Sequence, residues 1–413
     1  MKILHAGYLL GVGEAFGLVK EGAICFDERI VEIGDVAELK KRYPKAELIE
    51  AGSEYVVMPG LVNPHVHLEF SANRTTLKLG RFIPWLQSVI SYREMLRERC
   101  LEKGCIEKAL REIIQSGTTA IGAVSSFGDD LKACAASPLR VHFFNEVLGS
   151  NPAAVDALYA DFLARYEMSK AYENSRFTPA ISVHAPYSTH PILAKKVLSL
   201  AKAEKRLVST HFMESPAERE WLEEGSGEFA DFFREFMPSS RPMISPLQYL
   251  ELFEGADTLV THGVQADEQT VRKMAKMEMF LTHCPVSNRL LGNGRLDLKR
   301  MEREGLSWHL GTDGLSSNRS LSLWEEMRAA LMLHNESDPA EFASRLLKAA
   351  TRNGAEALGI DAGVLEAGRA ADLAVVPLPE IPEHEEDLPL QLILHTQKVE
   401  RIYIQGEKID GLF

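Results

Sequence analysis

Six residues could do chemistry together, because each follows a short apolar run and each has a side chain that binds metals or moves protons. They are His65, His67, His211, Glu214, His262 and Asp313. Imidazole nitrogens and a carboxylate oxygen suit zinc or ferrous iron, and three imidazoles with one oxygen leave a position for water. A metal ion held in this way lowers the pKa of bound water toward about 7. The sequence therefore predicts a metal-dependent hydrolase.

The pair His65 and His67 flanks a single valine. In a strand, residues two apart point to the same face, so both imidazoles could bind one ion. The spacing is weak evidence alone, because two core or surface histidines would look the same. Glu214, three residues after His211, could shuttle protons over the open metal position. A glutamate at the start of a helix, where the helix dipole favours it, is the alternative interpretation.

Eight apolar runs carry these residues and alternate with helical patterns. The runs cover residues 56–68, 118–124, 140–148, 178–186, 206–214, 257–264, 279–287 and 306–314. Eight strand–helix units predict a (β/α)8 TIM-type barrel, whose active site lies at the carboxyl ends of the strands. Polar residues end these runs, and they include Glu146, His184 and His283. We therefore expect residues far apart in the chain to converge on one mouth of the barrel.

The length of the chain requires more than a barrel. Its 413 residues exceed the roughly 250 of a bare barrel. Short β-like runs lie at both ends, separated by turn residues. We predict a metal-dependent barrel over residues 58–358 and one small β-sandwich domain assembled from residues 1–57 and 359–413.

Composition excludes several classes of protein. The net charge is −13, and lysines and arginines are scattered, which argues against a nucleic-acid partner. The five cysteines form no CxxC pair, so we expect reduced thiols and a cytoplasmic location. No apolar stretch reaches the length of about 18 residues that would indicate a membrane helix. The oligomeric state is open, and a homo-oligomer is compatible with the sequence.

Six motifs occur in order along the chain: PGLVNPHVH, HAPYS, THFME, VTHGV, HCPVSN and GTDGLSSN. Together they resemble the amidohydrolase superfamily, in its mononuclear deaminase branch. The resemblance implies one divalent ion, zinc or iron, bound by His65, His67, His211 and Asp313. It also implies catalytic roles for Asp313, which would take a proton from water, for Glu214, which would protonate a substrate ring nitrogen, and for His262, which would orient the attacking hydroxide. His184 and His283 would contact the substrate.

The segment after the first barrel strand, GRFIPWLQSVISYREML, is interpreted as a substrate-binding loop. Its Trp85 and Glu94 resemble residues of the adenosine-type deaminases in this family. The resemblance implies that Trp85 packs on a nucleoside and that Glu94 accepts hydrogen bonds from its ribose. It further implies an acidic 5′ substituent, for which Arg289 is the predicted cation, with Arg81 and Arg93 as further candidates. A core tryptophan and surface charges are the alternative interpretation of these residues.

Other functions share this ligand set. Deamination of S-adenosylhomocysteine, methylthioadenosine or adenosine would use the same metal site with another 5′ pocket. Deamination of guanine or cytosine fits less well, because these bases bring no ribose. A metal-free, non-catalytic barrel acting in assembly is the alternative from another class, and such a protein would be expected to lack ligands that this sequence retains.

Overall fold

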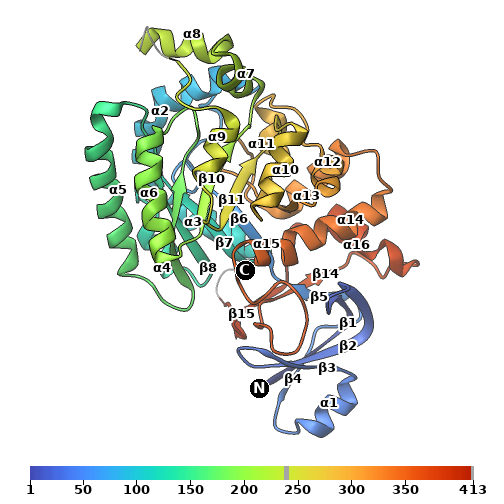
Figure 1. Ribbon diagram of the computed structural model, residues 1–413. Helices are drawn as coiled ribbons and strands as arrows, with labels where there is room; N and C mark the ends of the chain where they lie inside the picture. The colour runs from blue at the N-terminus through green and yellow to red at the C-terminus, as the bar shows by residue number, and fades with distance from the viewer. Residues whose placement is uncertain (237–240, 411–413) are drawn as a thin grey trace.

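The computed structural model describes residues 1–236 and 241–410, and its larger part is a parallel barrel wrapped by helices (Figure 1). Each strand pairs in parallel with the next one along the chain. Every predicted run overlaps one barrel strand, which confirms the predicted (β/α)8 fold. The strands are β6 (Leu61–Val66), β7 (Thr118–Ser125), β8 (Arg140–Val147), β9 (Phe177–Val183), β10 (Val208–Phe212), β11 (Thr258–His262), β12 (Phe280–His283) and β13 (Ser307–Leu310).

The first and last strands meet through hydrogen bonds at their carboxyl ends. The Asp313 backbone N–H donates to the His65 carbonyl at 3.1 Å. The Asn63 side chain accepts from the Thr312 N–H at 3.2 Å and donates to the Thr312 hydroxyl at 2.7 Å. Because these contacts join the two ends of the strand order, they place two predicted metal ligands side by side.

The helices cover the outside of the barrel, each with one buried face. In α3 the buried residues Ile106, Leu110 and Ile113 recur every three or four positions, as an amphipathic helix requires. None of the helices in the described part of the chain is long and apolar enough to cross a membrane. The helices that follow β6 are α2 (Phe82–Lys103), α3 (Cys105–Gln115), α4 (Leu131–Ala136), α5 (Val155–Lys170), α6 (Pro191–Glu204), α7 (Pro216–Glu224), α8 (Gly227–Phe236), α9 (Pro246–Glu251), α10 (Glu268–Lys276), α11 (Pro285–Leu290), α12 (Leu298–Arg303), α13 (Leu323–Leu333), α14 (Pro339–Lys348), α15 (Gly354–Ala357) and α16 (Leu388–His395).

A second sheet combines both ends of the chain, as predicted (Figure 1). Strand β14 pairs antiparallel with β5, which joins the C-terminal strands to the N-terminal ones. The helix α1 (Val36–Arg42) packs beside this sheet. The exact domain boundaries stay a prediction. The strands are β1 (Lys2–Val12), β2 (Gly17–Phe26), β3 (Ile30–Gly34), β4 (Glu47–Glu50), β5 (Tyr55–Pro59), β14 (Leu373–Pro377), β15 (Arg401–Ile404) and β16 (Glu407–Lys408).

The first predicted run divides between the two sheets at Gly60. Residues before it form β5 in the small sheet, and residues after it form β6 in the barrel. The Gly60 N–H donates to the Asp372 carbonyl at 2.9 Å. A Cβ on Gly60 would lie 2.2 Å from Thr119 Cγ2, so only glycine fits this crossing point. One apolar run therefore serves two sheets.

A buried ion pair holds the small sheet against the barrel, and it yields a stability prediction. The Arg140 Nε donates to Asp372 Oδ2 at 2.5 Å, and the Gln405 N–H donates to Asp372 Oδ1 at 2.7 Å. The Asp372 side chain is only 1% exposed. We expect Asp372→Ala to lower the free energy of unfolding by about 3 kcal/mol, because it leaves the nearly buried guanidinium of Arg140 without its negatively charged partner. Denaturant titration of the folded protein measures this loss.

The control is Asp156→Ala, which removes an ion pair with Lys196 on the surface. The Asp156 side chain is 90% exposed, so its loss should leave the denaturation midpoint unchanged. Equal effects of the two substitutions would contradict a special role for the buried pair.

Candidate metal centre

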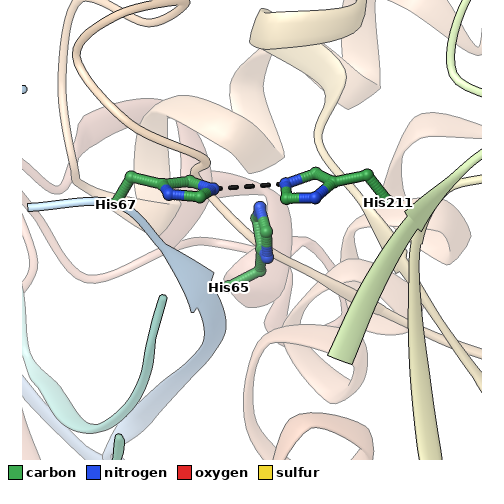
Figure 2. A group of neighbouring side chains, drawn as sticks. All are labelled: His65, His67 and His211. Carbon is green, nitrogen blue, oxygen red and sulfur yellow. Dashed lines mark hydrogen bonds between the residues drawn. The ribbon is translucent and has the colours of Figure 1, made fainter. Parts of the chain in front are cut away.

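Three imidazoles from two strands converge at the barrel mouth (Figure 2). The rings of His67 and His211 face each other with their Nε2 atoms 3.2 Å apart, and the ring of His65 points between them. The Asp313 Oδ1 atom lies 3.7 Å from Nε2 of both His65 and His67. Metal–nitrogen and metal–oxygen bonds of about 2.0–2.2 Å place neighbouring ligand atoms roughly 3–3.5 Å apart. These four residues therefore fit one divalent ion.

Hydrogen bonds on the far side of the rings orient the imidazoles. The His211 Nδ1 atom lies 3.1 Å from the His184 carbonyl, so it carries the proton and leaves the lone pair on Nε2. The His65 Nδ1 atom lies 3.2 Å from the Thr261 hydroxyl, and its buried Nε2 has no hydrogen-bond partner in residues 1–236 and 241–410. Burial, and next the neighbouring His65, lowers the pKa of His67 to about 4. Neutral imidazoles with free lone pairs are the form that binds metals.

The carboxylate of Asp313 is held in one orientation. Its Oδ1 accepts from the Gly314 N–H at 2.8 Å, and its Oδ2 accepts from the Ser287 and Ser317 hydroxyls at 2.8 and 2.7 Å. The backbone at Asp313 has a φ of 55° and that at His262 a φ of 76°. Non-glycine residues rarely adopt this left-handed conformation, and such strained positions cluster at functional sites.

Glu214 and His262 form the second part of the site. The Glu214 Oε1 atom lies 3.6 Å from His262 Nε2 and accepts a hydrogen bond from the Asn293 amide at 3.1 Å. Burial, and next the negative charge of Asp313, raises the pKa of Glu214 well above its usual value. A buried carboxyl that holds a proton near neutral pH can act as a general acid. The His262 Nδ1 atom lies 2.9 Å from the Asn288 amide oxygen, which orients the ring.

A second glutamate, which the sequence analysis did not identify, positions Glu214. The Glu218 carboxylate accepts from the backbone N–H groups of Met213 and Glu214 at 3.0 and 2.7 Å. The Ser215 hydroxyl accepts from the Glu218 N–H at 3.1 Å and caps the start of α7. The sequence contained a signal for this role, because a serine followed three residues later by a glutamate, as in Ser215 and Glu218, is typical of the start of a helix.

A cavity of about 510 Å³ opens above these residues. Its lining includes Trp85 and His184, which were predicted to bind substrate. The Trp85 Nε1 donates to the Ser316 carbonyl at 2.9 Å, which fixes the indole at the wall. The His184 Nδ1 atom lies 2.5 Å from the Ser188 hydroxyl. Most predicted site residues also line this cavity: His67, His211, Glu214, His262 and Asp313.

The predicted substrate loop is instead mostly helix, which changes the position of Glu94. Trp85 lies in the first turn of α2, and Glu94 follows nine residues later. Nine residues turn a helix through two and a half turns and advance it by about 14 Å. Glu94 is not among the residues that line the cavity, although Ile90 and Arg93 of the same helix are, and it pairs with Arg97 at 3.0 Å with its side chain 63% exposed. A contact of Glu94 with a substrate stays a prediction.

Two other predicted substrate residues lie outside the lining formed by the described residues. The buried His283 Nε2 atom lies 3.2 Å from His334 Nε2, behind the wall of the site. Arg289 is exposed near the end of α11. The lining contains Arg93, one of the further candidates for the cation, and also Glu146 and Arg165. Glu146 had a signal in the sequence, because it lies at the carboxyl end of a barrel strand.

Glu146 is buried and held in place by two hydroxyls. Its Oε2 accepts from the Ser126 hydroxyl at 2.6 Å, and its Oε1 accepts from the Ser182 hydroxyl at 3.3 Å. Its Oε1 also lies 3.9 Å from His211 Nδ1. Glu146, His184 and His211 form a second group of potential ligands next to the three imidazoles.

Comparison with known proteins connects this geometry to a family. The amidohydrolase family matches residues 56–409. The aminodeoxyfutalosine deaminase of a Nitratiruptor species is 49% identical over 391 residues, which are 95% of this chain and 96% of that protein. The adenosine deaminase of Helicobacter pylori is 36% identical over 415 residues, with 99% of both chains covered.

The fold agrees with these matches. The crystal structure of Helicobacter pylori aminofutalosine deaminase in complex with methylthio-coformycin superimposes with a TM-score of 0.93 at 35% identity, covering 99% of this chain and 100% of that chain. The match spans the barrel and the small sheet together. This chain belongs to the amidohydrolase family.

Proposed function

We propose that this protein is a metal-dependent deaminase that converts 6-amino-6-deoxyfutalosine to futalosine and ammonia, and so serves menaquinone biosynthesis. The observation that carries the proposal is the convergence of three buried imidazoles and Asp313 beside Glu214, a buried carboxyl. These groups surround a cavity large enough for a nucleoside. The 49% identity to an aminodeoxyfutalosine deaminase supports the choice of substrate.

In this proposal His65, His67, His211 and Asp313 hold one divalent ion, zinc or ferrous iron. When bound, the ion lowers the pKa of a water molecule to about 7 and supplies hydroxide at neutral pH. Asp313 accepts the proton of that water, and His262 orients the oxygen toward C6 of the adenine. Both residues already lie beside the three imidazoles.

Glu214 would protonate the ring nitrogen next to C6 while the oxygen bonds to that carbon. The C6 carbon then carries both oxygen and the amino group. The C6–N bond would break as the amino group takes the proton held by Asp313 and leaves as ammonia, and Glu214 would take the proton of the C6 hydroxyl, which gives the carbonyl and restores the carboxyl. The raised pKa of Glu214 supports this role, because the carboxyl must carry a proton before the reaction begins.

A second candidate is deamination of adenosine, S-adenosylhomocysteine or methylthioadenosine. The 36% identity to an adenosine deaminase favours it. The two candidates share the metal centre and differ only in what the cavity accepts at the 5′ position.

Ammonia release by the metal-loaded protein separates the candidates. We expect kcat/KM for 6-amino-6-deoxyfutalosine to exceed that for adenosine, methylthioadenosine and S-adenosylhomocysteine by at least about tenfold, because a matched pocket contributes more than about 1.4 kcal/mol. Guanine and cytosine serve as controls without a ribose. Equal values for adenosine and 6-amino-6-deoxyfutalosine would favour the second candidate.

A further inference from the structure

Two arginines that the proposed chemistry does not use line the cavity, and one of them, Arg165, is largely buried. Arg165 lies on α5 and lines the same cavity as His211 and Glu214. Its Nη2 donates to the Glu146 carbonyl at the end of β8, at 2.9 Å. In the sheet order, β8 is two strands away from β6 and two from β10, the strands that carry the imidazoles. The Glu146 Oε1 atom lies 3.9 Å from His211 Nδ1, so the residue that anchors Arg165 also lies next to the imidazoles.

Hydrogen bonds hold the guanidinium of Arg165 in position, but they do not use all of its N–H donors. Its Nε donates to Asp161 Oδ2 at 3.0 Å, and its Nη2 donates to the Glu146 carbonyl. Its Nη1 is buried and has no hydrogen-bond partner in residues 1–236 and 241–410. A buried charged donor without a partner is costly, so a partner that completes its bonding gains free energy. The arrangement favours an anion.

The neighbouring carboxylate does not cancel this charge. Asp161 is 69% exposed, so solvent screens it, while the Arg165 side chain is only 16% exposed. The same cavity wall also presents apolar side chains: Phe127, Leu148, Leu158, Phe232 and Phe233. An apolar or aromatic group that ends in an anion would satisfy both features.

Arg165 is better placed for this role than the other arginines. The Arg93 side chain also lines the cavity, but it is 43% exposed and lies beside Glu94 at 3.4 Å. Arg81 pairs with Glu228 and is 70% exposed. A buried, oriented guanidinium binds a carboxylate more strongly than an exposed one, because less water competes.

We propose that Arg165 is a specificity-determining residue that binds the carboxylate at the end of the substrate's 5′ substituent. The inference rests on the proposed function. It states that one side chain, Arg165, determines which adenine nucleoside the enzyme prefers. The guanidinium binds the carboxylate, and the apolar wall covers the group that links the carboxylate to the ribose.

The test compares two substrates and two variants. 6-amino-6-deoxyfutalosine carries the carboxylate, and methylthioadenosine has a neutral 5′ substituent. We expect Arg165→Gln to lower the ratio of kcat/KM for the first substrate over the second by roughly 30-fold, through KM, as loss of a hydrogen bond between charged groups predicts. The control variant Arg272→Gln, which alters an exposed arginine of α10 outside the cavity lining, should leave the ratio unchanged.

A change in the substrate tests the same contact without altering the protein. The carboxamide of 6-amino-6-deoxyfutalosine should be a poorer substrate of the wild-type enzyme by a similar factor. Arg165→Gln should add little to that loss, because the partner is already gone. An unchanged ratio for Arg165→Gln, or a carboxamide as good as the carboxylate, would overturn the inference, as would a ratio that falls for Arg93→Gln alone.

Binding distinguishes failure of this inference from failure of the proposed function. If the wild-type enzyme releases no ammonia from any nucleoside, the proposed function is wrong. Calorimetric titration with futalosine needs no turnover, and a Kd that rises roughly 30-fold in Arg165→Gln would still support the contact. An equal Kd for both proteins would overturn it.

Discussion

Removing the divalent ion with a chelator is expected to abolish ammonia release, and adding back zinc or ferrous ion is expected to restore it. The reason is that no residue of the site can deprotonate free water at neutral pH, whereas a bound ion lowers the pKa of water to about 7. Metal content and ammonia release are measured on the same samples. An apo protein with full turnover would contradict the proposed function.

A matched pair of histidine variants tests the ligand set. His67→Ala should lose both bound metal and activity, because it removes one of three imidazoles that face one point. His5→Ala removes a histidine of the small sheet that pairs with Glu50, and it should keep both. The fold of His67→Ala should persist, since the closing hydrogen bond between the Asp313 N–H and the His65 carbonyl does not depend on the ion. Equal metal content in the two variants would remove His67 from the ligand set.

Replacing Glu214 with glutamine is expected to lower kcat about 1,000-fold while the metal content stays at the wild-type level, as loss of a general acid predicts. Glutamine keeps the shape of the side chain and an oxygen that can accept from Asn293. It cannot transfer a proton to the ring nitrogen. Single-turnover kinetics with metal analysis separates loss of proton transfer from loss of the ion.

The control for this variant is Glu223→Gln on α7, the helix that follows Glu214. Glu223 pairs with Arg219 on the surface of α7, at 3.1 Å. Its substitution should leave kcat unchanged. A Glu214→Gln enzyme that retains activity within a few-fold of the parent would show that Glu214 is not the proton carrier.

The ends of the barrel strands were predictable from local pattern. A strand of four to eight apolar residues is short enough to be recognised alone, and parallel strands share one edge. The side chains of His211, His262 and Asp313 therefore had to converge once the eight runs were found. The roles of these residues in catalysis stay a prediction, which the experiments above address.

The face of a helix was not predictable in the same way. The interpretation of the segment after β6 as a loop came from the family resemblance, although its apolar residues Phe82, Leu86 and Val89 are spaced as in a helix. In the structure it is α2, with Trp85 in the first turn at the cavity and Glu94 63% exposed and paired with Arg97.

By itself, the sequence determined the barrel, the small sheet from both chain ends and the set of candidate metal ligands. These features depend on residues that act within one strand or at its end. Only the tertiary structure decided which charged side chains reach the cavity. His283 is held by His334 behind the wall, Arg289 faces solvent, and Arg165 comes inward from α5. The physical reason is that the surroundings of a side chain depend on helices that are distant in the sequence and pack against it. A local sequence pattern contains no information about that packing.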